Sequence, residues 1–166
     1  MSQLYYITGF MGSGKTTIGQ ALAKELEYNV VDTDQWIEEK MGLKISEIFQ
    51  EKGEAYFREL ETSALKEIEG SHMIITTGGG IVVNDINRQI MSSKGKIVYL
   101  QADLNELLRR LEGDQSRPLL QHKDRERIQH LYDSRLGFYE QADVIINTKG
   151  RTIAEIVTQL KTIMKS

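Results

Sequence analysis

Short apolar runs alternate along the chain with longer segments in which apolar residues recur at helical spacing. Five of the runs are brief and rich in β-branched residues: 4–8, 29–31, 73–77, 96–100 and 143–146. Continuous apolar runs of this length are typical of strands that are buried on both faces of a parallel sheet. The sequence therefore predicts a sheet of five parallel strands.

Between these runs, apolar residues gather on one face of each predicted helix. In residues 14–26, for example, the shared face holds Ile18, Ala21, Leu22 and Leu26. The same spacing recurs in residues 53–69, 103–111, 125–141 and 152–164. Strands that alternate with helices imply right-handed crossovers and a sheet covered on both faces. No repeat or linker interrupts the pattern, so we predict a single α/β domain over residues 1–166.

The composition narrows the class of partner. A formal charge of −3 offers no broad basic face for nucleic acid. The absence of cysteine excludes disulfides and cysteine-ligated zinc, and we interpret the scattered His72, His122 and His130 as surface residues. No run approaches the roughly 18 apolar residues of a membrane span, and the first residues lack a signal-peptide pattern. We expect a cytoplasmic monomer that binds neither nucleic acid nor membrane.

The stretch GFMGSGKT at residues 9–16 follows the first predicted strand and opens the first predicted helix. It matches G-x-x-x-x-G-K-[ST], in which glycines let consecutive backbone N–H groups point at a phosphate chain. The helix N-terminus adds about half a positive charge. Lys15 can reach the β- and γ-phosphates, and the Thr16 hydroxyl can bind Mg²⁺. A glycine-rich turn formed by chance is the alternative, but the strand–loop–helix setting predicts a nucleoside triphosphate site.

Two acids, Asp32 and Asp34, follow the second predicted strand. On an extended backbone they would project to one side and repel each other unless a cation or a donor separates them. The alternative is that one of them caps a helix that begins near residue 35.

Three glycines, Gly78, Gly79 and Gly80, follow the third predicted strand, where many enzymes with this type of phosphate loop carry a magnesium-binding acid. We therefore expect Asp32 to supply that carboxylate instead. The glycines either bring bare N–H groups close to a bound molecule or form a tight turn, for which one glycine would suffice.

Three arginines lie where an anion could bind. Arg135 falls on the apolar face of the helix predicted over 125–141, where an unpaired charge is costly. A bound anion explains it no better, from spacing alone, than the alternatives of a snorkelling side chain or a protein salt bridge. Arg58 has glutamates at i−4 and i+3, which suit a surface ion pair. Arg117, in a polar loop, could fold over the phosphates or simply be solvated.

Taken together, these motifs and their order resemble the shikimate kinase family. The resemblance runs through nearly the whole chain, and beyond the elements above it rests on Gly53-Glu54-x-x-Phe57-Arg58, Arg117-Pro118-Leu119 and Arg135-x-x-x-Tyr139. It implies a three-layer α/β fold of the P-loop kinase type, like that of nucleoside monophosphate kinases, with a five-stranded parallel sheet. It also implies a lid at about 113–123, an acceptor-binding region at about 32–61, and ATP-dependent phosphorylation of the 3-hydroxyl of shikimate, a step towards chorismate and the aromatic amino acids.

The resemblance further implies roles for individual residues. Residues that would bind ATP are Gly12, Ser13, Gly14, Lys15, Thr16, Thr17, Arg110 and Arg117. Mg²⁺ would bind Thr16 and Asp32. Residues that would contact the acceptor are Asp34, Arg58, Gly79, Gly80 and Arg135, with the two arginines gripping the shikimate carboxylate. The catalytic residues would be Lys15, Asp34 and Arg117.

One region departs from the family pattern, which often places an acid and a proline in the loop after the last strand. Residues 147–151 read NTKGR, so no contacts to the base are assigned there. Gluconate kinase is the nearest alternative, because it has a related phosphate loop and a hydroxy-acid substrate. A non-catalytic ATP-binding module is the alternative from another class, although no expected catalytic residue is missing. A GTPase is disfavoured because no Asn-Lys-x-Asp signature occurs.

Overall fold

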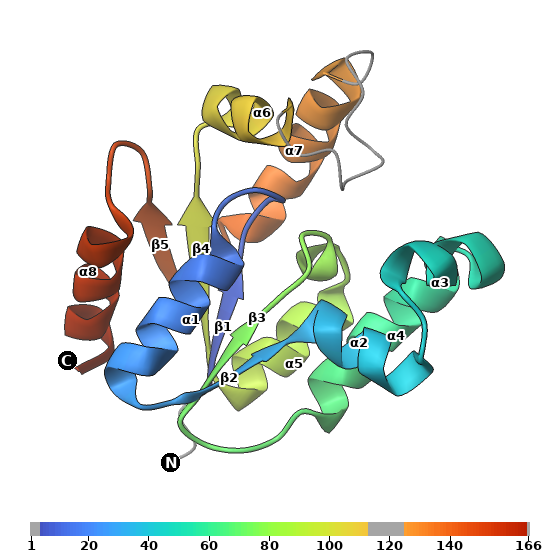
Figure 1. The fold of residues 1–166 in the computed structure, drawn as a ribbon, viewed down its shortest axis with the longest axis horizontal. Helices are drawn as coiled ribbons and strands as arrows, with labels where there is room; N and C mark the ends of the chain where they lie inside the picture. Colours follow the sequence, from blue (N-terminus) through green and yellow to red (C-terminus); the bar gives the residue numbers. More distant parts are fainter. Residues whose placement is uncertain (1–3, 113–124, 166) are drawn as a thin grey trace.

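A sheet of five parallel strands forms the centre of the structure, a computed structural model that describes residues 4–112 and 125–165 (Figure 1). The strands are β1 (Leu4–Thr8), β2 (Asn29–Asp32), β3 (Met73–Thr76), β4 (Lys96–Gln101) and β5 (Val144–Asn147). Their order in the sheet is β2-β3-β1-β4-β5, and every neighbouring pair is parallel. All five strands therefore end at the same edge of the sheet.

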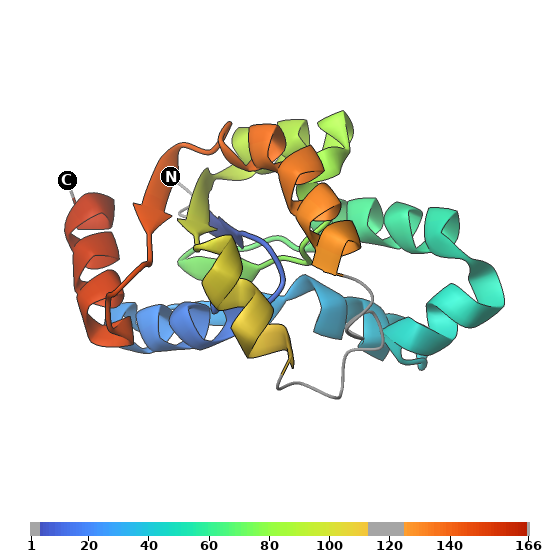
Figure 2. The same cartoon turned by 90° about the horizontal axis from the view of Figure 1, so that it is seen from above.

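Helices cover both faces of this sheet, which is seen from above in Figure 2. One face is covered by α1 (Lys15–Leu26) and α8 (Ile153–Lys165), and the other by α4 (Glu54–Glu67), α5 (Asp85–Lys94) and α7 (Arg125–Tyr139). Successive strand residues alternate between the two faces. In β1, for example, Ile7 packs in the cluster beneath α1 and α8, whereas Tyr6 packs in the opposite cluster. Burial on both faces explains the continuous apolar runs.

The remaining helices lie beyond the sheet. Helices α2 (Thr33–Met41) and α3 (Ile45–Lys52) pack on α4, α6 (Leu104–Glu112) follows β4, and the 3-10 turn η1 (Ile81–Val83) follows β3. The sequence analysis did not predict α3 or α5. In α5 the exposed Ile86 and the buried Asn87 reverse the usual pattern, which hides its periodicity. No helix in the described residues is both long enough and apolar enough to span a membrane.

The chain leaves neighbouring strands towards different faces of the sheet. From β1 it enters α1 on one face, whereas from β3 and β4 it continues to helices on the other face. In open parallel sheets, ligands bind at the carboxyl ends of the strands where connections diverge in this way. Because β1 lies between β3 and β4, the connections diverge beside the loop of residues 9–16.

Gly19 lets α1 lie directly on β3, and we predict that Gly19→Ala lowers the free energy of unfolding by about 1–3 kcal/mol. A Cβ atom there would fall well inside van der Waals contact with Cγ2 of Thr76, whose hydroxyl donates to Asp32 Oδ2 at 2.7 Å. The matched control is Gly137→Ala on α7, where a Cβ atom would meet nothing within 4 Å. Urea denaturation should show the control unchanged or slightly stabilised; equal loss in both variants would contradict the close packing.

Candidate active site

The loop of residues 9–16, which we call the phosphate loop, turns from β1 into α1. Gly12 and Gly14 adopt φ values of 81° and 92°, which residues with a side chain disfavour. Lys15 is the first residue of α1, and its Nζ donates to the Gly9 carbonyl at 2.6 Å. The ammonium group therefore lies over the loop, at the positive end of the helix dipole, where an anion is stabilised.

The other residues predicted to bind ATP border this loop where the structure describes them. Ser13 is buried in the loop, and Thr16 and Thr17 are exposed in the first turn of α1. Arg110 on α6 donates to the Gly12 carbonyl at 2.9 Å, which brings its guanidinium to the loop. Arg117 and the lid predicted over residues 113–123 lie outside the described residues.

Asp32 and Asp34 have different surroundings although one residue separates them. Asp32 caps α2: its Oδ1 accepts from the Gln35 N–H at 3.0 Å, and its Oδ2 accepts from the Thr76 hydroxyl at 2.7 Å. The expectation of an extended backbone through Asp34 is wrong, because α2 begins at Thr33 and places Asp34 in its first turn. The capping alternative is therefore confirmed for Asp32, whereas the Asp34 carboxylate does not cap the helix.

Asp34 carries the most perturbed carboxyl group of the site. Its Oδ1 is shielded from solvent and has no hydrogen-bond partner among the described residues. Burial, and then the charge of Asp32, raise the pKa of Asp34 from 3.8 to about 6, while Lys15 and Arg58 oppose the rise. A carboxylate that titrates near neutral pH and has a free lone pair is suited to orient a hydroxyl and accept its proton.

Residues 78–80, which we call the glycine segment, lie against charged side chains of the neighbouring helices. A Cβ atom at Gly78 would lie 2.9 Å from Oδ1 of Asp34 and 3.0 Å from Oε2 of Glu61. Both distances are shorter than carbon–oxygen van der Waals contact, so these carboxylates occupy the space that a side chain would need.

Arginine side chains lie close to the other two glycines, Gly79 and Gly80. A Cβ atom at Gly79 would lie 3.3 Å from Nη1 of Arg135, and one at Gly80 would lie 2.6 Å from Nη1 of Arg58. None of the three glycines has a positive φ angle, so backbone conformation does not require them. Of the two interpretations of the glycine segment, close approach rather than a tight turn fits the structure.

Glu61 holds Arg58 from inside the protein. Its side chain is 1% exposed, and its Oε1 accepts from Nη1 of Arg58 at 2.8 Å. Burial raises the pKa of Glu61, and the charge of Arg58 opposes that rise. Glu54, by contrast, is exposed and lies 3.9 Å from Arg58. The alternative of a purely surface ion pair is therefore wrong, because the stronger partner of Arg58 is buried.

Arg135 lies in the interior, with 8% of its surface exposed. Its guanidinium lies over the Phe10 ring, 5.8 Å from the centroid. Among the described residues, no carboxylate lies within ion-pair distance of it, so the salt-bridge alternative finds no support there. One turn later on α7, the Tyr139 hydroxyl donates to the Gly79 carbonyl. An anion bound at the glycine segment would pair with Arg135.

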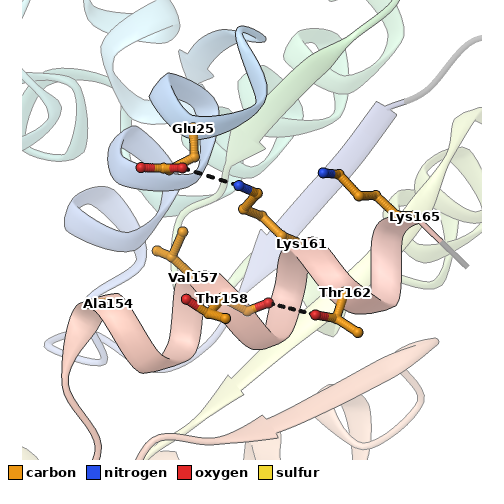
Figure 3. Close-up of a pocket in the computed structure, with 7 residues that line it drawn as sticks. All are labelled: Glu25, Ala154, Val157, Thr158, Lys161, Thr162 and Lys165. Atoms are coloured by element: carbon orange, nitrogen blue, oxygen red, sulfur yellow. Dashed lines mark hydrogen bonds and ion pairs between the residues drawn. The ribbon is translucent and has the colours of Figure 1, made fainter.

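A separate hollow of about 330 Å³ lies along α8, beside the end of α1 (Figure 3). Across it, Lys161 donates to Glu25 at 3.2 Å, while along α8 itself Thr162 donates to the Thr158 carbonyl at 3.1 Å. These groups are paired with one another on a helical surface. The unpaired carboxylate oxygens and the arginines instead converge at the glycine segment, where we place the candidate active site.

A phosphate loop at the end of the central strand of a covered parallel sheet defines a P-loop nucleotide-binding fold. The family model for shikimate kinase matches residues 11–165. The chain belongs to the shikimate kinase family, and the predicted family, fold class and enzyme class are confirmed.

The similarity to individual relatives extends over nearly the full chain. A shikimate kinase of Bacillus anthracis is 48% identical over 156 residues, which cover 94% of this chain and 94% of that protein. The solved shikimate kinase of Bacteroides thetaiotaomicron gives a TM-score of 0.89 at 36% identity and covers 99% of both chains. The shikimate kinase of Acinetobacter baumannii, solved in complex with shikimate, gives a TM-score of 0.92 at 32% identity, covering 99% of this chain and 94% of that one.

Sequence reasoning did not assign a role at the site to Glu61 or Tyr139. Glu61 was treated as a surface residue, yet it lies four residues after Phe57 and four before Leu65, both of which are buried. Its place on the apolar stripe of α4 was the available signal. Tyr139 lies on the apolar face of α7, and no pattern in the sequence shows that its hydroxyl reaches Gly79.

We predict that Asp34→Asn raises the free energy of unfolding at pH 7 by about 1–3 kcal/mol. The pKa of Asp34 is raised on folding, from 3.8 to about 6. The carboxyl group therefore destabilises the folded protein progressively as the pH rises through this interval, and the gain should shrink on acidification towards pH 4. Asp32→Asn is the control for the charge pair: it removes the Asp32 charge that raises the pKa of Asp34, so stability should depend less on pH between pH 4 and 7 than in the wild type. Urea denaturation at several pH values tests both, and a loss of stability in Asp34→Asn at pH 7 would contradict the assignment.

Proposed function

We propose that this protein transfers the γ-phosphoryl group of ATP to the 3-hydroxyl of shikimate, giving shikimate 3-phosphate and ADP. The observation that carries the proposal is the convergence of one poised carboxylate and two arginines on the glycine segment, beside the phosphate loop. A Cβ atom at Gly79 would lie 3.5 Å from the Met11 backbone nitrogen, so the two segments adjoin. The relative solved in complex with shikimate supports the same acceptor.

The acceptor is a ring that carries one carboxylate and three hydroxyls. In the proposal, Arg58 and Arg135 bind the carboxylate, each held by its own neighbours. Glu61 pairs with Arg58 at 2.8 Å, and the Phe10 ring faces Arg135. Arginines preorganised in this way lose little side-chain entropy on binding, so more of the charge-assisted interaction appears as affinity.

Asp34 is proposed to orient the 3-hydroxyl and to accept its proton. The hydroxyl oxygen attacks the γ-phosphorus, the bond from that phosphorus to the β–γ bridging oxygen breaks, and ADP leaves with the electron pair. If the transition state is loose, the proton moves late, and orientation of the hydroxyl contributes more than early deprotonation. With a pKa of about 6, Asp34 is mostly ionised at pH 7 and can take the proton.

On the nucleotide side, Lys15 and the backbone N–H groups of the phosphate loop are proposed to face the β- and γ-phosphates. They are aimed at charge that accumulates on the phosphoryl oxygens as the group moves. Arg110, already at the Gly12 carbonyl, would approach the nucleotide from α6. The role predicted for Arg117, and the expectation of a cytoplasmic monomer, stay predictions.

Mg²⁺ is proposed as the cofactor, held by Thr16 and Asp32. Each carboxylate oxygen of Asp32 accepts one hydrogen bond, from Gln35 and from Thr76, and so keeps a lone pair for a metal. An all-oxygen donor set with one carboxylate suits Mg²⁺ that also binds phosphates. When bound, the ion neutralises charge on the β- and γ-phosphates.

The direct test is ADP release from ATP and Mg²⁺ with shikimate, with gluconate, or with no acceptor. We expect release that depends on shikimate, and a turnover reduced by about 10² or more in Asp34→Asn. Release that depends on gluconate would favour the nearest alternative. No release with any acceptor would favour a binding module, and near-normal turnover of Asp34→Asn would remove Asp34 from the mechanism.

For the carboxylate site, we predict that Arg135→Lys raises the KM for shikimate about 10- to 100-fold, because a bidentate charge-assisted contact is worth roughly 1.5–3 kcal/mol. The KM for ATP should stay within about twofold. Arg127→Lys is the matched control, since Arg127 is exposed on the same helix. An unchanged KM for shikimate in Arg135→Lys would show that the carboxylate binds elsewhere.

A further inference from the structure

The glycine segment offers hydrogen-bond donors but no free carbonyl. The Gly78 carbonyl accepts from the Ile81 N–H at 3.2 Å, and the Gly80 carbonyl accepts from the Val83 N–H at 3.2 Å. The Gly79 carbonyl accepts from the Tyr139 hydroxyl. Within the described residues, no acceptor is bonded to the N–H groups of Gly79 and Gly80. Both donors therefore remain for a ligand.

Of the three hydrogen bonds to carbonyls of this segment, the bond from Tyr139 is the one that comes from a side chain and not from the local backbone. The bonds to Gly78 and Gly80 belong to the turn that leads into η1 and would persist without any side chain. The Tyr139 ring is 1% exposed and is stacked on the Tyr99 ring, with centroids 4.9 Å apart. Burial raises the pKa of Tyr139 to about 12, although Arg135 opposes the rise. The hydroxyl therefore keeps its proton, and so its ability to donate, across the physiological range.

A trans peptide points its carbonyl and the following N–H in opposite directions. The peptide between Gly79 and Gly80 is trans, since the described residues contain no cis peptide. A hydrogen bond that fixes the Gly79 carbonyl therefore also fixes the direction of the Gly80 N–H. Gly79 and Gly80 have no side chains of their own to hold the peptide in place, so this bond is an effective restraint.

We propose that Tyr139 is a positioning residue of the acceptor site, which holds the Gly79–Gly80 peptide so that the Gly80 N–H points at a ring hydroxyl of the acceptor. This inference rests on the proposed function, because it takes shikimate as the acceptor. Tyr139 does not touch the acceptor itself; it acts through the peptide to which its hydroxyl donates.

The test compares Tyr139→Phe with a matched control on the same helix. Tyr139→Phe removes the hydroxyl and keeps the ring that stacks on Tyr99. The control, Tyr132→Phe, removes the same group from α7, but that hydroxyl donates to the Ala102 carbonyl at 3.2 Å, away from the glycine segment. We expect Tyr139→Phe to raise the KM for shikimate roughly three- to tenfold, the range of one hydrogen bond, with the KM for ATP unchanged. Tyr132→Phe should change neither.

Acceptor analogues separate a role through the peptide from a role through Arg135, which also faces the Tyr139 hydroxyl. Two analogues each lack one ring hydroxyl that is not phosphorylated, and a third carries a carboxamide in place of the carboxylate. We expect the effect of Tyr139→Phe to shrink with one deoxy analogue, because the contact is already missing, and to persist with the carboxamide. The reverse result would show that Tyr139 acts through Arg135 and would overturn the inference.

A measurement without the acceptor keeps this inference distinguishable from the proposed function. The ¹⁵N order parameter of the Gly80 amide, measured by nuclear magnetic resonance relaxation, should be lower in Tyr139→Phe than in the wild type and in Tyr132→Phe, because the peptide loses its restraint. Equal order parameters in all three proteins would overturn the inference even if shikimate is phosphorylated. A wild type inactive with shikimate would instead refute the proposed function, and the order parameters would still decide whether Tyr139 orders the glycine segment.

Discussion

The candidate site depends on the absence of side chains at three consecutive residues. Gly78, Gly79 and Gly80 leave room for carboxylates and guanidinium groups to lie against the backbone at distances that a Cβ atom would forbid. Because these groups are largely shielded from water, their mutual attraction and repulsion are stronger than on an exposed surface. Any residue larger than glycine would displace a charged group, so the electrostatics of the site follow from this local requirement for space.

The fold brings the charged side chains of three different helices together at the glycine segment. Asp34 comes from α2, Glu61 and Arg58 come from α4, and Arg135 comes from α7, all of which are connected to strands that end at the same edge of the sheet. Rigid elements hold reacting groups more accurately than loops do. The phosphate loop approaches from the opposite face, through α1, so the two halves of the site meet at the point where the connections diverge.

The sequence was sufficient for the architecture and for the residue types at each strand end, because both follow from local patterns. Apolar runs revealed the strands, and the glycine-lysine motif revealed the phosphate loop. It was not sufficient for Glu61 or Tyr139, because their importance lies in contacts across elements. The partner of Tyr139 is a backbone carbonyl 60 positions away, and no side-chain pattern marks a carbonyl. Likewise, α5 was missed because the buried Asn87 is polar and donates to the Ile81 carbonyl at 3.0 Å.

Two buried carboxylate oxygens connect stability to recognition. Oδ1 of Asp34 and Oε2 of Glu61 both lie where a Gly78 side chain would be, and neither has a donor among the described residues. Folding thus removes two acceptors from water without replacing their hydrogen bonds, which destabilises the acceptor-free protein. A ligand hydroxyl that donates to either oxygen recovers that energy, whereas a ligand without the hydroxyl leaves a buried acceptor without a donor. Selectivity for a polyhydroxylated acid can therefore arise from the two buried acceptors that have no hydrogen-bond donor within the described part of the acceptor-free protein.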